Sequence, residues 1–404
     1  MRRIPFAIGA WARAFALAGA LAAWPAAAAQ FETTAPTAIL MHKDSGAVLF
    51  EKNADEAVAP ASLVKLMTVE ILFHRLATDR LKPDDEFAVS ERAWREGGAA
   101  SGGSTMFLPL NSKVKVEDLL RGIIVQSGND ATIVAAEGIS GTQEAFVDLM
   151  NARAKELGLT GSTFRNPHGL DHPEQVVTMR DMAKLAAHII RTYPEKYRIF
   201  SEEEFTFNDI RQRSRNPLLH AGIGDGLKTG YTTEAGYGLV ASAERDGMRL
   251  ILAMHRMKTP RERAEEARKV MSWGLHAFEE DKLFAAGETI AQAHVLGGAE
   301  STVPVAAAGP VSMVKPRGER KAETATRLDG PIWAPVRKGD RLGTLEVRVG
   351  ETRAEYPLVA AADVAQGGIG ARAWGSVAQY LTWDTVVGIY NWWREPGETA
   401  TATK

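Results

Sequence analysis

The chain has 404 residues, of which 45% are apolar and 24% are charged, and this composition excludes a wholly disordered chain and a collagen-like fibre. It contains no cysteine, which excludes a disulfide framework, a thiolate metal site and a cysteine nucleophile. The formal net charge of -2 offers no basic excess, so we expect no nucleic-acid partner. A chain of this length corresponds to two or three domains of roughly 100–200 residues each.

Residues 1–29 have the pattern of a secretory signal peptide. Three arginines come first, an uncharged apolar run follows at 14–24, and Pro25 and the alanines at 27–29 end the segment. A membrane-spanning helix is the weaker alternative, because such a run spans only ~16 Å of a ~30 Å hydrocarbon core. We therefore expect cleavage near Gln30 and a mature protein that works outside the cytoplasm.

The next segment, residues 30–280, predicts a helix-rich region that turns into a sheet. The expected strands are 38–41 and 47–50, which form a hairpin, and later 227–230, 237–243 and 249–254. The expected helices are 63–76, 116–125, 131–138, 142–158, 178–193 and 260–280. This order favours an α+β domain, in which helices cover an antiparallel sheet.

The hydrophobic pattern changes in the C-terminal third of the chain. Short alternating segments without helical period predict a small all-β domain of β-sandwich type over residues 281–370. Residues 371–394 contain four of the nine tryptophans and favour an aromatic-rich helix that anchors the protein to a membrane surface. Because the helical periodicity of this segment is weak, packing against the β domain is the alternative. Residues 395–404 are expected to be a disordered tail.

A serine and a lysine three residues apart begin the first long helix. Ser62 and Lys65 would share a helical face, and burial lowers the pKa of a lysine, so Lys65 could act as a base for the Ser62 hydroxyl. The same spacing recurs at 112–115 and 312–315, which we interpret as solvated loop or strand residues. Only Ser62 follows a Pro-Ala turn and opens an apolar helix.

Two further short motifs are individually weak. Ser127, Gly128 and Asn129 form a plain turn with a helix N-cap in the simplest interpretation, although a hydroxyl and a carboxamide there could also reach a substrate amide. The run at 228–230, Lys-Thr-Gly, is either a surface strand or an edge strand that pairs with an extended peptide. In the second case Lys and Thr would bind the peptide carboxylate, and glycine would permit close approach.

The three motifs together are far more specific than any one of them. Their order and spacing resemble those of the serine penicillin-binding proteins and β-lactamases. Gly128 and the Pro-Ala lead-in to Ser62 resemble the low-molecular-mass D-alanyl-D-alanine carboxypeptidases of peptidase family S11, and residues 166–171 and 235–243 are similar to further segments of that family. The resemblance covers nearly all of residues 30–394 and implies a β-lactamase/transpeptidase-like catalytic domain.

The resemblance also implies a role for each motif residue. Ser62 is the acylated nucleophile, Lys65 its base and Ser127 the group that passes a proton to the leaving amine. The implied substrate-binding residues are Asn129 for the amide, Lys228, Thr229 and Gly230 for the carboxylate end, the backbone N–H of Tyr231 together with that of Ser62 for the oxyanion, and Arg256 for the carboxylate. Family members often carry histidine where Tyr231 stands, so only its backbone role is inferred.

The expected protein is a periplasmic serine carboxypeptidase attached peripherally to the inner membrane. It would remove the terminal D-Ala from peptidoglycan pentapeptides through an acyl-enzyme, and β-lactams would acylate the same serine. We expect no cofactor and no metal: His168 and His172 have a possible ligand spacing, but prolines bracket them.

Three other functions are compatible with parts of this pattern. A class A β-lactamase is disfavoured because no Glu-x-x-Leu-Asn string stands between Ser127 and Lys228. An inactive cell-wall-binding protein is disfavoured because every motif residue is present. A D,D-endopeptidase that acts on cross-links has the same motifs, and the sequence does not separate it firmly from a carboxypeptidase.

Overall fold

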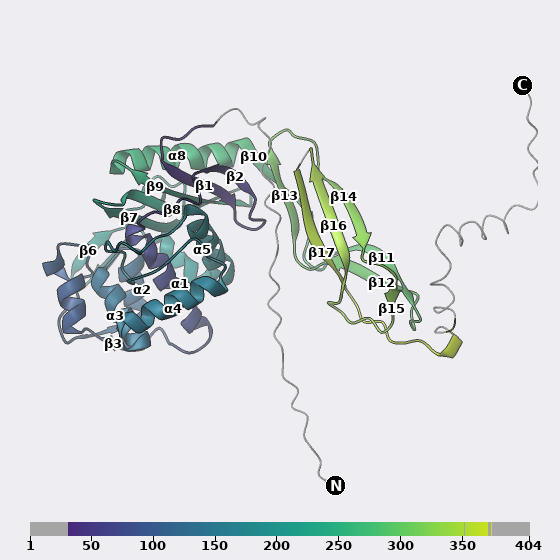
Figure 1. Cartoon of the computed structure of the whole chain (residues 1–404), viewed down its shortest axis with the longest axis horizontal. Coiled ribbons are helices and arrows are strands. Elements are labelled where there is room, and N and C mark those ends of the chain that lie inside the picture. Colours follow the sequence, from purple (N-terminus) through teal and green to yellow (C-terminus); the bar gives the residue numbers. More distant parts are fainter. Residues whose placement is uncertain (1–30, 351, 371–372, 374–404) are drawn as a thin grey trace, which may run out of the picture.

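Two differently built parts succeed one another along the chain in the computed structural model, which describes residues 31–350, 352–370 and 373 (Figure 1). The first part combines a central sheet with helices, and the second consists of strands. The expected signal peptide, membrane anchor and tail lie outside the described residues, apart from residue 373. Among the helices that are described, none is long and apolar enough to cross a membrane.

The central sheet of the first part is antiparallel, with the strand order β2-β1-β9-β8-β7. Its strands are β1 Thr37–His42, β2 Val48–Lys52, β7 Gly226–Thr232, β8 Gly236–Arg245 and β9 Met248–Met257. The expected hairpins are confirmed, and Asp246 and Gly247 turn between β8 and β9 with positive φ angles of 53° and 80°. β7, which carries Lys-Thr-Gly, is an edge strand of this sheet and keeps one side open for pairing.

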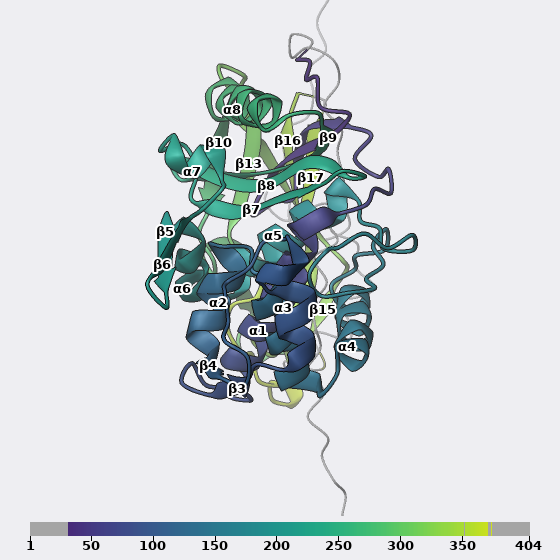
Figure 2. The same cartoon turned by 90° about the vertical axis from the view of Figure 1, so that its left-hand side faces the viewer.

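Helices cover both faces of this sheet (Figure 2). Alternate side chains of β1 and β9 point to opposite faces: Ile39 and Ile251 join a core shared with α1–α5, whereas Leu40 and Leu250 join a core shared with α8. The helices are η1 Ala61–Val64, α1 Lys65–Ala77, α2 Val116–Ile124, α3 Asn129–Ser140, α4 Gln143–Glu156, α5 Met179–Thr192, α6 Pro194–Tyr197, α7 Pro217–His220 and α8 Pro260–Ala277. The predicted α+β architecture is confirmed.

Two short hairpins complete the first part on the α1–α5 side. They are β3 Glu86–Ala88 with β4 Lys113–Lys115, and β5 Glu204–Phe207 with β6 Ile210–Arg213. Gln126, at the end of α2, donates a side-chain hydrogen bond to the carbonyl of Phe205 at 3.1 Å, so the second hairpin packs beside the turn that carries Ser127.

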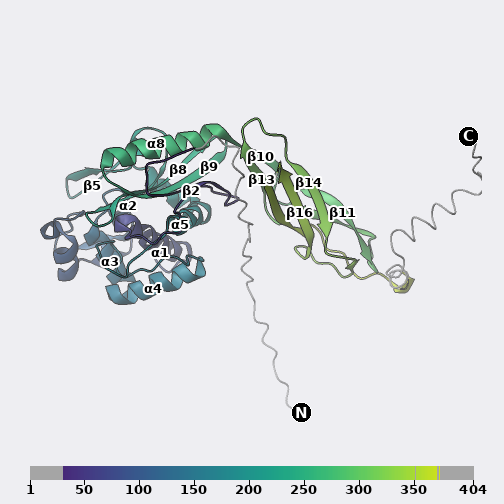
Figure 3. The same ribbon diagram turned by 45° about the horizontal axis from the view of Figure 1, so that its top comes forward.

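The second part is built mainly from strands, as predicted, and has its own apolar core. Its strands are β10 Phe278–Phe284, β11 Thr289–Leu296, β12 Thr302–Ala307, β13 Val311–Pro316, β14 Glu323–Leu328, β15 Ile332–Trp333, β16 Arg341–Val349 and β17 Thr352–Ala360. β10 pairs with β13 beside the end of α8, and the six-stranded sheet extends away from it (Figure 3). The final helix of the first part is shorter than expected: α8 ends at Ala277, and β10 begins at Phe278, which is extended and buried.

Candidate active site

Ser62 and Lys65 lie one turn apart where η1 passes into α1. The Lys65 side chain is fully buried, as predicted. Its Nζ donates hydrogen bonds to Ser62 Oγ at 2.9 Å, to Asn129 Oδ1 at 2.7 Å and to the carbonyl oxygen of His168. The amine therefore connects the first motif directly to the second.

Burial makes Lys65 a usable base. Removal from water and, second, the charge of Arg215 lower the pKa of the Lys65 ammonium to about 7, and the charge of Asp130 opposes this shift. Near neutral pH a large fraction of the amine is then uncharged. An uncharged amine has a lone pair for the Ser62 proton and two N–H bonds for its other partners.

Ser127 and Lys228 form a second hydroxyl–amine pair. Ser127 stands between α2 and α3 with a positive φ of 62°, and Lys228 Nζ donates to Ser127 Oγ at 2.8 Å and to the Thr229 carbonyl at 3.0 Å. Burial, and then the charges of Lys65 and of two arginines, hold the pKa of Lys228 well below its usual range. The three motifs thus meet in one place, as the sequence predicted.

The turn that carries Ser127 is held by a buried carboxylate. Asp130 accepts hydrogen bonds from Thr105 Oγ1 at 2.7 Å and from the backbone N–H groups of Met106 at 2.8 Å and Leu108 at 3.1 Å. Charge-assisted bonds of this kind are stronger than neutral ones. They hold the segment that follows residues 97–104, which are rich in Gly, Ser and Ala, against the start of α3.

The loop at 166–171 completes the floor of the site. Gly169 has φ +90°, and a Cβ built there would lie 2.0 Å from the carbonyl oxygen of Ala61. Only glycine therefore lets this loop lie on η1 and bring the His168 carbonyl to Lys65. The sequence indicated this segment by resemblance, but it did not reveal the bond between Lys65 and the His168 carbonyl.

The Lys-Thr-Gly strand lies directly against η1. A Cβ built on Gly230 would lie 3.1 Å from the Pro60 carbonyl oxygen and 3.2 Å from the backbone nitrogen of Ser62. This close approach is between β7 and η1, whereas the approach expected from the sequence, that of a bound peptide, stays a prediction. The approach of β7 to η1 brings the backbone of Tyr231 beside that of Ser62.

Two arginines near Lys228 were not predicted from the sequence. Arg215 Nη1 donates to Ser104 Oγ at 2.6 Å, and Arg263 of α8 is buried, with Nη2 3.4 Å from the Arg215 carbonyl oxygen. Within the described part of the chain, the buried Nε of Arg263 has no hydrogen-bond partner. No local pattern marks either residue, because Arg215 stands in a polar loop and Arg263 in a highly charged helix.

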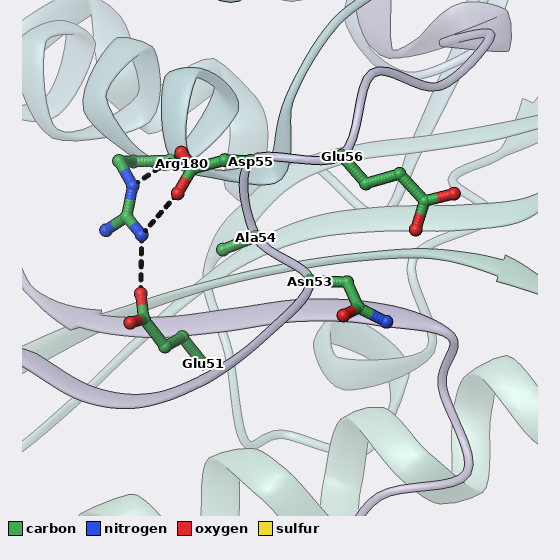
Figure 4. Close-up of a pocket in the computed structure, with 6 residues that line it drawn as sticks. All are labelled: Glu51, Asn53, Ala54, Asp55, Glu56 and Arg180. Carbon is green, nitrogen blue, oxygen red and sulfur yellow. Dashed lines mark hydrogen bonds and ion pairs between the residues drawn. The ribbon is translucent and has the colours of Figure 1, made fainter.

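Arg256, by contrast, forms an ion pair with Glu56, and its side chain is half exposed. Glu56 lines a surface depression together with Glu51, Asn53, Ala54, Asp55 and Arg180, where Arg180 binds Glu51 and Asp55 (Figure 4). The charges that act on Lys228 include those of Arg215 and Arg263. Because the Arg256 side chain is engaged by Glu56, this arrangement does not support the expected contact of Arg256 with the terminal carboxylate of the substrate.

The other two serine–lysine pairs lie outside this cluster. Lys115 is solvated and pairs with Asp84 at 3.0 Å, as expected. Lys315 lies on β13 and is buried, so the expectation of a solvated residue was wrong there; Glu279 binds its ammonium at 2.6 Å. An amine engaged by a carboxylate is a poor base.

The histidines take no part as ligands in the described structure. His168 is buried, and burial together with the charge of Lys65 lowers its pKa to about 3, while His172 is exposed. Across residues 31–350, 352–370 and 373, no group of three or more His, Cys, Asp and Glu side chains could hold a metal ion.

A serine paired with a buried lysine, a second serine–lysine pair and an open edge strand define an active-site serine enzyme of the penicillin-binding type. Residues 24–259 match the family described as D-alanyl-D-alanine carboxypeptidase, peptidase family S11, and residues 278–366 match the C-terminal domain of penicillin-binding protein 5. The chain therefore belongs to the D-alanyl-D-alanine carboxypeptidase family, and the resemblance drawn from its motifs is confirmed.

Individual relatives agree with this membership. The D-alanyl-D-alanine carboxypeptidase DacC of Escherichia coli is 43% identical over 84% of this chain and 86% of its own length. The structure of penicillin-binding protein 5 from Haemophilus influenzae is 40% identical, with a TM-score of 0.78 over 83% of this chain and 98% of that one. Penicillin-binding protein D2 of Listeria monocytogenes, in its ampicillin-bound form, is 29% identical, with a TM-score of 0.52 over 60% of this chain and 97% of that one.

Proposed function

We propose that Ser62 is the nucleophile and Lys65 the base of a serine-type D-alanyl-D-alanine carboxypeptidase. The chain has this activity as a member of its family, and neither the endopeptidase nor the β-lactamase alternative is better supported. The single observation that carries the assignment is the fully buried Lys65 Nζ at 2.9 Å from Ser62 Oγ. Together with the lowered pKa of Lys65, this geometry fits proton abstraction near neutral pH.

The reaction proceeds in two halves. In the first, Lys65 takes the hydroxyl proton, Ser62 Oγ attacks the carbonyl carbon between the two D-Ala residues, and Ser127 gives its proton to the leaving amine as the C–N bond breaks. Lys228, which donates to Ser127 at 2.8 Å, is placed to restore that proton. In the second half, a water molecule hydrolyses the ester on Ser62 and releases the shortened peptide.

Substrate contacts follow from the same geometry. The substrate strand adds to the open side of β7, Asn129 binds an amide of the peptide, and the backbone N–H groups of Ser62 and Tyr231 stabilise the oxyanion. The terminal carboxylate binds at Lys228 and Thr229 of β7. Its negative charge offsets the desolvation that lowers the pKa of Lys228 and favours the protonated amine.

Arg263 is the arginine that we assign to this carboxylate. Its buried Nε–H has no hydrogen-bond partner among the described residues and is therefore available to a substrate oxygen. The positive charge of Arg263 is also one of the causes that lower the pKa of Lys228. Arg263→Ala should lower kcat/KM about 30-fold for a peptide with a free C-terminal acid, the loss typical of one partner of a buried charged pair. Arg256→Ala is the matched control and should change kcat/KM for this peptide less than threefold.

The measurement compares a peptide ending in the acid with the same peptide ending in the amide. The Arg263→Ala loss should be confined to the acid. An equal loss on the amide would contradict the carboxylate role of Arg263, and a loss in Arg256→Ala confined to the acid would restore the assignment made from the sequence.

β-Lactams are the expected covalent inhibitors. Their strained amide and carboxylate resemble the D-Ala-D-Ala terminus, so acylation would occur at Ser62. The ampicillin-bound penicillin-binding protein D2 of Listeria monocytogenes, which has the related fold, supports this proposal.

We further propose that residues 1–29 are a cleaved signal, that 30–277 form the catalytic domain and 278–370 the β domain, and that 371–394 attach the periplasmic enzyme to the inner membrane. The four tryptophans of the last segment support attachment, because aromatic rings favour the membrane interface.

A mature chain that ends near Ala371 should stay soluble and keep its carboxypeptidase activity, whereas the full mature chain should float with anionic liposomes in a density gradient. Flotation and release of D-Ala measure the two properties. If the shortened chain unfolds, or if the full mature chain does not bind liposomes, the segment is part of the β-domain core and not an anchor.

A further inference from the structure

The side chain of Tyr231 has no task in the proposed mechanism, although it stands beside the nucleophile. The residue is 51% exposed, in contrast to the buried Lys228 and Thr229 on the same strand. Tyr231 directly follows Gly230, and a Cβ atom built on Gly230 would lie 3.2 Å from the backbone nitrogen of Ser62. A large aromatic surface is therefore open to whatever occupies the site.

The ring is held in place from one side. Tyr231 lies directly opposite Tyr237 in the β7–β8 pairing, and the two rings stack with their centroids 4.1 Å apart and their planes at 23°. The guanidinium carbon of Arg263 lies 5.6 Å from the centroid of the Tyr237 ring. Tyr237, which Arg263 contacts, therefore covers one face of the Tyr231 ring and holds it in place. The other face of the Tyr231 ring is a preformed surface.

The strand geometry places this surface next to the leaving end of the substrate. Side chains alternate along a strand, so Tyr231 and Thr229 share one face of β7, whereas Lys228 points toward Ser127. The proposed function puts the C-terminal carboxylate at Thr229 and Arg263. The residue that carries this carboxylate must therefore lie alongside the Tyr231 ring, and the acyl part of the peptide extends past it.

We propose that the Tyr231 ring is a specificity-determining wall for the C-terminal residue, against which an apolar side chain of the leaving group packs. This inference rests on the proposed carboxypeptidase function and goes beyond it by naming the feature that selects the leaving residue. A D-Ala methyl buries apolar surface against the ring, glycine has no side chain to bury, and a charged side chain would lose hydration there.

The test uses two peptides that are identical up to the penultimate D-Ala and end in either D-Ala or glycine. The preference is the ratio of their kcat/KM values, measured from the released amino acid with the whole mature enzyme. In Tyr231→Ala this preference should fall roughly fourfold, the value of one buried methyl group, whereas Tyr231→Phe should keep it. Trp333→Ala, which removes another exposed ring in the β domain, is the matched control and should change nothing.

A second pair of peptides varies the acyl side. The two members differ only in whether the ε-amino group of the residue before D-Ala-D-Ala is free or acetylated, and their kcat/KM ratio should be the same in Tyr231→Ala and wild type. Melting temperatures establish that the variants are folded.

An active, folded Tyr231→Ala enzyme with the wild-type preference for D-Ala over glycine would overturn this inference and leave the carboxypeptidase assignment standing. A change of the acyl-side ratio equal to that of the leaving-side ratio would also overturn it, because the ring would then act on the whole peptide. A wild-type enzyme that releases no D-Ala would overturn the proposed function itself, and this inference with it.

Discussion

Replacing Ser62 by alanine should lower the release of D-Ala by ~10⁴-fold or more, since the variant has no atom that can form the acyl-enzyme. The fold should persist, because the hydroxyl is lost from a partly exposed side chain and Lys65 keeps its bonds to Asn129 and His168. Release of D-Ala from a pentapeptide and a thermal melt measure the two quantities.

Two other serines provide matched controls for this variant. Ser112 and Ser312 also precede a lysine by three residues, but their lysines pair with Asp84 and Glu279. Ser112→Ala and Ser312→Ala should both remain active. If the Ser62→Ala enzyme kept more than a few per cent of wild-type turnover, the nucleophile would have to be sought elsewhere.

Lys65→Arg should lower the acylation rate by ~10²–10⁴-fold, the range that a positioned general base contributes. Arginine keeps the positive charge but does not lose its proton, so it cannot accept the proton of Ser62. Stopped-flow acylation by a fluorescent penicillin measures the rate. Lys115→Arg, at the solvated pair, is the control, and a folded Lys65→Arg enzyme that acylates at the normal rate would remove Lys65 from the role of base.

The same assignment sets the pH dependence. A base acts when it is uncharged, so kcat/KM for the wild-type enzyme should rise with pH through the Lys65 pKa of about 7. Below that pH the ammonium is protonated and activity should fall about tenfold for each pH unit. The residual activity of Lys65→Arg should not show this rise with pH.

Much of the site could be predicted because its chemistry sits in short motifs. Ser62 and Lys65 are separated by one helical turn, so helical geometry alone brings them together. Lys228 lies in the outermost of three consecutive antiparallel strands, so its edge position was also predictable. The contacts of Lys65 with Asn129 and of Lys228 with Ser127 were not predicted, because 64 and 101 residues separate the partners in the chain.

The remaining contacts depend on packing that local sequence does not encode. Arg263 reaches the site only because α8 lies on the sheet face that Thr229 and Tyr237 share. Arg256 lies at the end of β9 with a positive φ of 68°, and its side chain pairs with Glu56. The alternating pattern of a strand cannot reveal such a local irregularity.

The boundary between the two parts shows a similar limit. Apolar spacing predicted a helix to residue 280, but Phe278 and the strand that it begins bury apolar surface against β13, so α8 ends at Ala277. Tertiary pairing outweighed helical propensity over three residues. The all-β character of residues 281–370 was nevertheless predictable from their alternation.

Locating the covalent bond tests the assignment of Ser62 as the nucleophile most directly. The mature enzyme is treated with a fluorescent penicillin, digested under conditions that keep the ester, and analysed by tandem mass spectrometry. The acyl group should be found on Ser62, and the peptides that contain Ser112, Ser127 and Ser312 should be unmodified. An acyl group on any of these three, with Ser62 free, would contradict the assignment of Ser62 and Lys65 as nucleophile and base.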